Sequence, residues 1–106
     1  MSGPGPALES DDRNRLAPQA LDDLRSLHAY IAEESPVAAH RVAKRIVDNV
    51  QTLLSENPEI GRPGRVAGTR ELVIPKTPFV VTYRLRGQTV EVLRVYHGAR
   101  KWPDRL

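Results

Sequence analysis

The sequence predicts an α+β fold in which a helical hairpin packs on one face of a small antiparallel β-sheet. Two observations predict it. Residues 18–56 repeat apolar side chains at the three- and four-residue steps of amphipathic helices, with one break at Ser35-Pro36. Residues 70–97 contain three short runs rich in Val, Ile, Leu, Phe and Tyr, separated by turn residues, which is typical of a three-strand meander. Each helix needs an apolar partner for its stripe, and we expect the sheet to provide it.

The chain ahead of the first helix contains two different segments. Residues 1–12 are rich in Gly, Pro and acidic residues and have almost nothing to bury, which predicts a flexible N-terminal tail before a single domain at 13–106. Residues 13–16 (Arg-Asn-Arg-Leu) are short and polar. A strand of this composition fits only the edge of a sheet, so we expect a short N-terminal edge strand beside the meander.

Proline signals delimit the two helices. Pro18 suits the first turn of the first helix. Ser35-Pro36 ends that helix and starts the second, because serine is a good N-cap and proline fits the first helical position. Asn57-Pro58 stops the second helix. The expected buried stripes are Leu21, Leu24, Leu27 or His28, and Ile31 in the first helix, and Ala39, Val42, Ala43, Ile46, Val50, Leu53 and Leu54 in the second.

Residues 59–69 form the connection between the helices and the sheet. They contain three glycines, one proline and two arginines without a helical or strand period, which predicts a loop. Its backbone N–H groups and two guanidinium groups could hold an anion. The alternative interpretation, a solvated connection, is the ordinary one for this composition.

Alternation of apolar and polar side chains predicts the two faces of the sheet. Residues 90–97 are ambiguous because both alternating sets are half apolar, and we interpret this run as a central strand covered on both faces. The alternation also places Tyr96 and His97 on opposite faces. In the preceding run the set facing the helices is Phe79, Val81, Tyr83 and Leu85, and the set on the reverse face is Val80, Thr82, Arg84 and Arg86.

The reverse face is expected to leave Val80 and Thr82 exposed beside Arg84 and Arg86. An apolar floor with a cationic border of this kind suits a helix or an added strand that carries Leu, Val and Glu. The charge distribution supports an acidic or polyanionic partner at the sheet end. Residues 61–106 hold ten Lys or Arg against three Asp or Glu, whereas residues 1–60 hold six against ten.

Composition excludes several classes of protein. The chain contains no cysteine, which excludes disulfides and thiolate metal sites and is typical of a reducing compartment. No apolar run approaches the roughly 18 residues of a membrane span, and the N-terminus lacks the basic-then-apolar order of a signal peptide. We therefore expect a cytoplasmic protein without membrane contact, metal or cofactor.

The order of helix, helix, Gly-Arg-Pro-Gly-Arg loop and meander resembles the RelE/ParE superfamily of toxins from bacterial type II toxin-antitoxin operons. The resemblance extends from about Arg13 to Pro103 and depends on the order and spacing of its segments. It implies a small toxin with an edge strand, two helices and an antiparallel sheet, held in a hetero-oligomer by an acidic or amphipathic segment of a cognate antitoxin. The segments are ALDDL (20–24), YIA (30–32), GTREL (68–72), LRVYH (93–97) and WP (102–103).

The superfamily divides by target. RelE-like members cut mRNA on the ribosome, and ParE-like members are DNA gyrase inhibitors. The longer helical hairpin, the loop and the LRVYH strand are more similar to ParE, so we expect an inhibitor of DNA gyrase with no catalytic residues. The residues expected to bind the antitoxin or the target are Arg62, Arg65, Arg70, Arg84, Arg86, Arg94, Arg100 and Trp102.

Two alternatives to gyrase inhibition stay open. The first is a ribosome-dependent mRNA endoribonuclease, which needs an acid, a base and cations around the phosphate. The second is a non-toxic binding module whose basic sheet holds RNA or an antitoxin. Several of these residues also have a structural interpretation, His97 as a packed strand-end residue, Arg70-Glu71 as an ion pair and Trp102 as a cap on the core. The candidates for the nuclease are His97, Glu71, Tyr96, Arg70 and Arg94.

Overall fold

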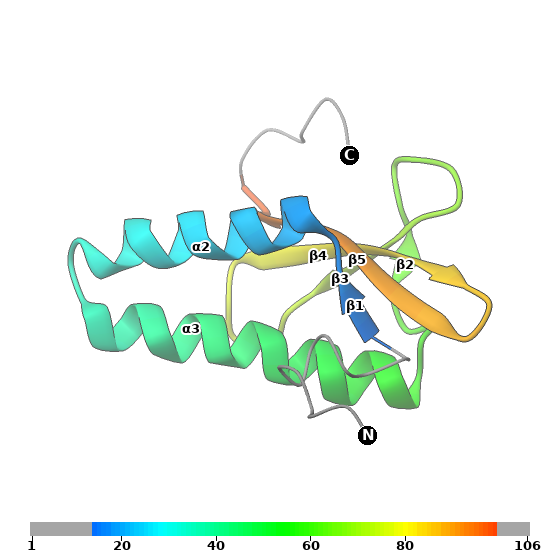
Figure 1. The fold of residues 1–106 in the computed structure, drawn as a ribbon, viewed down its shortest axis with the longest axis horizontal. Helices are drawn as coiled ribbons and strands as arrows, with labels where there is room; N and C mark the ends of the chain where they lie inside the picture. The colour runs from blue at the N-terminus through cyan, green and yellow to red at the C-terminus, as the bar shows by residue number, and fades with distance from the viewer. Residues whose placement is uncertain (1–13, 100–106) are drawn as a thin grey trace, which may run out of the picture.

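The computed structural model describes residues 14–99, in which two helices pack on a five-strand mixed sheet (Figure 1). The expected tail at 1–12 and the candidates Arg100 and Trp102 lie outside the described residues. The strand order is β1-β5-β4-β3-β2. The elements are β1 (Asn14–Leu16), α2 (Pro18–Ala32), α3 (Pro36–Asn49), the π-helix η1 (Val50–Leu54), β2 (Arg62–Pro63), β3 (Arg70–Val73), β4 (Phe79–Arg86) and β5 (Thr89–His97).

The helix starts follow the sequence signals. Pro18 occupies the first turn of α2 and Pro36 the first turn of α3. The hydroxyl of Ser35 accepts the backbone N–H of Ala38 at 3.1 Å, which satisfies one of the otherwise unpaired N–H groups at the start of α3. The predicted N-cap is therefore confirmed.

The second helix changes its winding near its end. Directly after α3, Val50–Leu54 form a π-helical turn that the apolar period did not indicate. At the junction, the side-chain amide of Asn49 donates to the carbonyl oxygen of Arg45 at 2.7 Å. Val50 and Leu54 are both buried, so the predicted stripe reaches the core despite this change.

The meander is confirmed, and two further strands complete the sheet. β3, β4 and β5 pair antiparallel in chain order, and Gly87 supplies the positive φ (60°) of the turn between β4 and β5. β1 lies at an edge as expected, but it pairs parallel with β5. The prediction of an irregular loop over residues 59–69 is wrong at Arg62 and Pro63, because these residues form β2 on the outer side of β3.

A β-bulge explains the ambiguous pattern of β5. Thr82 pairs with Arg94 and Tyr83 pairs with Val92, so Leu93 is an extra residue without an opposite partner. The bulge shifts the alternation by one residue and brings Val95 to the core side with Val92. β5 is an inner strand of the sheet, as predicted, and none of its residues is exposed. The shift of phase made both alternating sets look half apolar.

The core lies between the helices and one face of the sheet. On the reverse face Val80 and Thr82 are only 5% and 0% exposed, so the expectation that they form an exposed floor is wrong. Gly98 lies against this face. Its N–H donates to the carbonyl of Pro78 at 2.7 Å, and a Cβ added at Gly98 would lie 3.3 Å from a methyl group of Val80. The buried apolar cluster consists of Ala20, Leu27, Ile46, Val50, Leu54, Ile74, Phe79, Val81, Tyr83, Val90, Val92 and Val95.

Candidate binding surface

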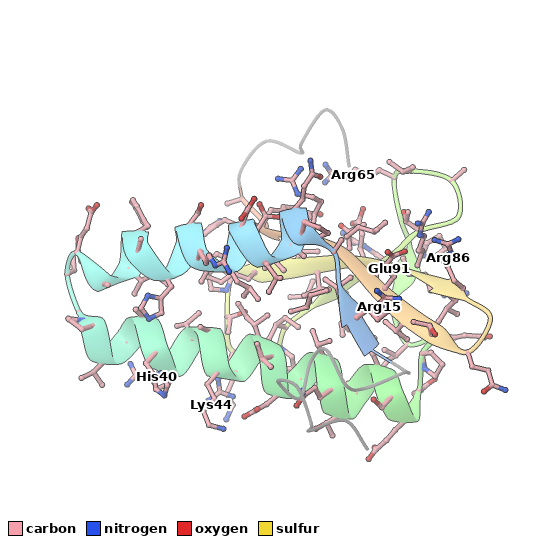
Figure 2. The ribbon with its side chains drawn as sticks, in the orientation of Figure 1. Arg15, His40, Lys44, Arg65, Arg86 and Glu91 are labelled. Atoms are coloured by element: carbon pink, nitrogen blue, oxygen red, sulfur yellow. The ribbon has the colours of Figure 1, made fainter. Side chains whose placement is uncertain are left out.

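Three arginines surround Glu91 on the face of the sheet that points away from the helices. Arg84 lies opposite Glu91 in the β4–β5 register, and its Nε lies 2.7 Å from Oε1 of Glu91. A guanidinium nitrogen of Arg86 lies 3.8 Å from the same oxygen. Arg15 is the register partner of Glu91 across the parallel β1–β5 pair, and its side chain is exposed. Figure 2 shows Arg15, Arg86 and Glu91 at this end of the sheet, away from His40 and Lys44 on α3.

A second carboxylate, Glu71, holds the 59–69 connection against the same face. Its side chain is 2% exposed and accepts from a guanidinium nitrogen of Arg62 at 3.3 Å and from the backbone N–H of Arg65 at 3.1 Å. Arg62 remains 66% exposed. Glu71 and Arg84 share a face because both lie in register with this side of β4, Glu71 opposite Thr82.

Tyr96 belongs to the surroundings of Glu71. Burial raises the pKa of the Tyr96 phenol above its ordinary value of 10.0, and the carboxylate of Glu71 raises it further. Arg65, Thr82 and Arg62 act in the opposite direction. The phenol is therefore held in its neutral form, since both burial and a nearby negative charge disfavour phenolate.

The start of the connection is anchored from the helix-facing side of the sheet. The hydroxyl of Tyr83 accepts the N–H of Gly61 at 2.9 Å and donates to the carbonyl of Pro58 at 2.8 Å. Arg70 donates to the carbonyl of Gly61 at 2.7 Å and to that of Glu59 at 3.2 Å. A Cβ on Gly61 would lie 2.7 Å from the Tyr83 hydroxyl, so only glycine fits here. Arg70 thus holds backbone on the side away from Glu71.

Burial also changes the titration of the anchoring phenol. It raises the pKa of Tyr83 above 10.0, and this effect outweighs the hydrogen bond from Gly61 and the charge of Arg70, which lower it. The anchor fixes the position of the two arginines that follow it, Arg62 and Arg65.

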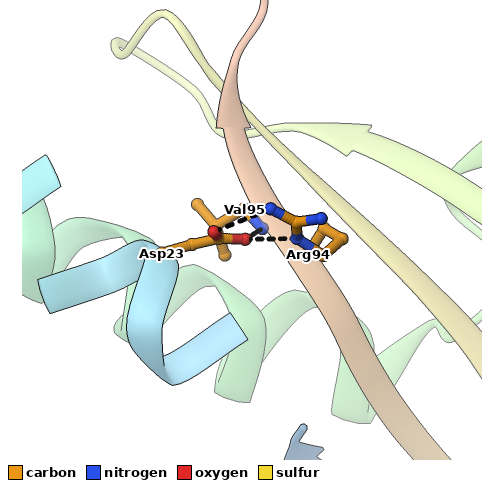
Figure 3. A network of polar contacts seen from close by, with 3 residues as sticks. All are labelled: Asp23, Arg94 and Val95. Carbon is orange, nitrogen blue, oxygen red and sulfur yellow. Dashed lines mark hydrogen bonds and ion pairs between the residues drawn. The ribbon is translucent and has the colours of Figure 1, made fainter. Parts of the chain in front are cut away.

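Arg94 is engaged by a helix. Its Nε and one terminal nitrogen donate to the two oxygens of Asp23 at 2.8 and 3.0 Å, a bidentate contact between β5 and α2 (Figure 3). The same carboxylate accepts the N–H of Val95 at 2.9 Å. β1 covers the edge of β5 only as far as Val92, so Asp23 satisfies an edge N–H that lies beyond the end of β1.

The Asp23–Arg94 contact is largely shielded from water. The side chains of Arg94 and Asp23 are 20% and 17% exposed, and the hydrogen bond to Asp23 raises the pKa of the guanidinium above its ordinary value. Sequence reasoning missed Asp23. The only local signal is an acidic pair, Asp22-Asp23, in which Asp22 instead lies 3.6 Å from Arg25 at the surface.

The five nuclease candidates do not converge on one site. The ring of His97 packs edge-on against Phe79 with 5.5 Å between centroids, and its Nδ1 accepts the N–H of Ala99 at 3.1 Å. The predicted opposite orientation of His97 and Tyr96 is confirmed. Glu71 and Tyr96 lie together, whereas Arg70 and Arg94 hold other parts of the chain.

Two negative results concern residues 14–99 alone. No helix in this range is both long enough and apolar enough to span a membrane. Over the same residues, no group of three or more His, Asp or Glu side chains is arranged to hold a metal ion.

A helical hairpin on a five-strand mixed sheet with a buried helix-facing side is the RelE/ParE-like α+β fold. A solved structure described as "Chromosomal ParDE TA system from P. aeruginosa" matches it with a TM-score of 0.71 and 28% identity, covering 80% of this chain and 94% of that chain. Residues 15–102 match the family described as "ParE toxin of type II toxin-antitoxin system, parDE". The chain belongs to this ParE toxin family.

Two curated relatives carry different names. A protein of Sinorhizobium fredii named "Putative toxin Y4kP" is 42% identical over 97 residues, which cover 92% of this chain and 99% of the relative. "Toxin RelE2" of Caulobacter vibrioides is 39% identical over 82 residues, covering 77% of this chain and 90% of the relative. The first of these names states no branch of the superfamily, and the second is a RelE name.

Proposed function

We propose that this toxin inhibits DNA gyrase by binding it, and that a cognate antitoxin neutralises it. The match to the parDE toxin family over residues 15–102 is the observation that carries the proposal. The similarity to a solved ParDE system supports an antitoxin as the physiological partner.

The geometry of the nuclease candidates favours binding over RNA cleavage. A general base must reach the proton it removes, yet the Glu71 side chain is 2% exposed and its oxygens already accept from Arg62 and Arg65. Arg94 is held by Asp23 and cannot clamp a phosphate without breaking that contact. His97 lies on the opposite side of β5 from Tyr96, so the two cannot act on one phosphate.

Ribosome-dependent mRNA cleavage is the second candidate. It is favoured by the 39% identity to a relative named as a RelE toxin and by the proximity of Tyr96 to Glu71, Arg62 and Arg65. In that case Tyr96 would donate a proton and the two arginines would bind the phosphate.

The antitoxin requires an apolar contact that the centre of the reverse face does not provide, since Val80 and Thr82 are buried. The outer edge of β3 is the better place. β2 pairs only with Arg70 and Glu71, which leaves Val73, 54% exposed, beyond its end. An added antitoxin strand would pair with the backbone there and cover Val73.

Two assays on the purified chain test the choice of target. Inhibition of gyrase supercoiling without transcript cleavage in a translation extract is the expected result. His97→Ala should retain the inhibition, because binding does not require an imidazole, and Tyr96→Phe should retain it too. The proposal would be rejected in favour of the nuclease if the chain cleaved transcripts and if Tyr96→Phe lowered the cleavage rate by about 100-fold or more.

A further inference from the structure

Five arginines on the reverse face form what we call the arginine face: Arg15, Arg62, Arg65, Arg84 and Arg86. Only two carboxylates, Glu71 and Glu91, lie among them within residues 14–99, so the face carries a net charge of three positive. Both carboxylates lie deeper than their partners. Glu71 is 2% and Glu91 22% exposed, whereas Arg62 and Arg86 are each 66% exposed.

This arrangement orients cations without neutralising the face. A guanidinium has five N–H donors, and contact with one carboxylate oxygen leaves others directed outward. Oε1 of Glu91 accepts from Nε of Arg84 at 2.7 Å. Glu71 accepts from the guanidinium of Arg62 and from the backbone N–H of Arg65, which holds the segment that carries both arginines. The Tyr83 anchor holds the start of the same segment, so the backbone that carries Arg62 and Arg65 is fixed before any ligand arrives.

Among residues 14–99, none offers an apolar anchor at the centre of the arginine face. Val80 and Thr82, which alternation places there, are 5% and 0% exposed. Stable protein–protein interfaces depend on buried apolar or aromatic anchors, whereas protein–DNA interfaces are more polar and much more positively charged. Single-stranded nucleic acid needs aromatic platforms for its bases, and Tyr96, the aromatic residue beside Glu71, is partly buried and held by its neighbours.

The dimensions of the sheet also fit a duplex backbone. Strands lie about 4.8 Å apart, so the five strands from β1 to β2 span about 19 Å. Over that length a DNA duplex presents roughly eleven phosphate charges, one per about 1.7 Å of its axis. Arg15 on β1, Arg62 on β2, and the two arginines of β4 can therefore contact several phosphates at once.

We infer that the arginine face binds the phosphate backbone of double-stranded DNA without reading its sequence. The choice of DNA over duplex RNA rests on the proposed function, because gyrase holds DNA and the toxin would reach that DNA beside the enzyme. Binding to the backbone itself requires no gyrase, and the following experiment contains none.

Fluorescence anisotropy of the full chain with a labelled duplex of about 20 base pairs, at salt between about 50 and 200 mM, tests the inference. We expect a dissociation constant between about 10⁻⁴ and 10⁻⁶ M near physiological salt, the same for unrelated sequences. The double variant Arg15→Gln, Arg86→Gln should lower the slope of log affinity against log salt by about two and weaken binding by about 10- to 100-fold.

The variant and its control are matched in charge. Arg15→Gln, Arg86→Gln leaves the Arg84–Glu91 contact intact, so the sheet should fold normally and melt at the same temperature. Arg25→Gln, Arg41→Gln removes the same charge from exposed positions of the helices and should leave the salt slope unchanged. An equal loss in both variants would overturn the inference, because net charge and not this face would then be responsible.

Three other results would also overturn it. They are the absence of binding at low salt, tighter binding of single-stranded DNA or duplex RNA, and equally tight binding of polyglutamate. The last would assign the face to an acidic protein segment. Failure of the proposed function is separately visible, because a chain that binds DNA but leaves supercoiling intact rejects gyrase inhibition and keeps the DNA contact.

Discussion

Two arginine–carboxylate contacts of this toxin use the same chemistry for different ends. Arg94 and Asp23 are 20% and 17% exposed and join β5 to α2 across 71 residues of sequence. Arg84 and Glu91 are 42% and 22% exposed and lie seven residues apart in one hairpin. Because water screens the second pair more than the first, breaking the first pair should cost more stability than breaking the second.

The comparison separates arginines that hold the fold from arginines that are available to a partner. Arg94 and Arg70 were both candidates for binding, yet each is committed to the chain, to Asp23 and to the carbonyls of Gly61 and Glu59. Arg62, Arg84 and Arg86 also have partners, but at least 42% of each side chain remains exposed. Arginine count alone therefore overstates the binding surface.

We expect the largest loss in the free energy of unfolding from breaking the Asp23–Arg94 contact. Asp23→Ala leaves the guanidinium of Arg94 and the N–H of Val95 without their acceptor, so we expect a loss of about 2–3 kcal/mol in the free energy of unfolding. Urea denaturation measures it. Asp22→Ala is the matched control, because its pair with Arg25 is exposed, and it should change stability by less than about 0.5 kcal/mol. Equal losses in the two variants would contradict the comparison.

The anchor beneath the arginine face should rank next. Tyr83→Phe removes the hydroxyl that accepts from Gly61 and donates to Pro58, leaving two polar backbone groups unsatisfied. We expect a loss of about 1–2 kcal/mol, with faster hydrogen exchange at the Gly61 amide. Tyr30→Phe, on a side chain that is 65% exposed, should stay within about 0.5 kcal/mol. An unchanged Gly61 amide would show that Arg70 alone holds the segment.

Alkaline pH should lower the free energy of unfolding through a tyrosine on each face of the sheet. The pKa values of Tyr83 and Tyr96 are raised above 10.0 in the folded chain, so the unfolded chain loses these protons first. The contribution of the two tyrosines to the free energy of unfolding is complete below about pH 10. Above that pH it falls by at most about 1.4 kcal/mol per pH unit for each tyrosine. Urea unfolding between about pH 9 and 11 measures the fall. Tyr96→Phe should make it shallower, and an identical slope would show that Tyr96 does not contribute.

The smallest effect is expected at the exposed pair. Glu91→Gln removes the carboxylate between Arg84 and Arg86, whose side chains already contact water, and stability should change by less than about 0.5 kcal/mol. Thermal melting at low and high salt measures this change. A loss as large as that of Asp23→Ala would mean that Glu91 holds the sheet together, and the distinction between the two contacts would fail.

Local signals specified the helices and the meander correctly. Ser35 caps α3 and Pro18 and Pro36 start the helices as the sequence indicates, because caps and proline positions depend on the backbone within one turn. The strand runs and their turns depend on residues that are close in the chain, so the same reasoning predicted the antiparallel order of β3, β4 and β5.

Side-chain partners could not be predicted in the same way. Arg62, Arg65, Arg84 and Arg86 were chosen as binding candidates by charge, and all lie around Glu71 or Glu91 on one face. Glu71 was considered as a catalytic base, whereas its 2% exposure and its contacts make it the acceptor that fixes the connection. Exposure of a charged residue depends on what packs over it, and no pattern within the strand carries that information.

The sequence by itself determined where the helices begin, which runs become the meander, and that positive charge concentrates in the second half of the chain. Only the tertiary structure decided that β2 extends the sheet, that a bulge at Leu93 changes the phase of β5, and that Asp23 covers an edge N–H and holds Arg94. The reason is distance along the chain. Caps, turns and alternation depend on neighbouring residues, whereas pairing at an edge depends on which distant group arrives to satisfy an open N–H.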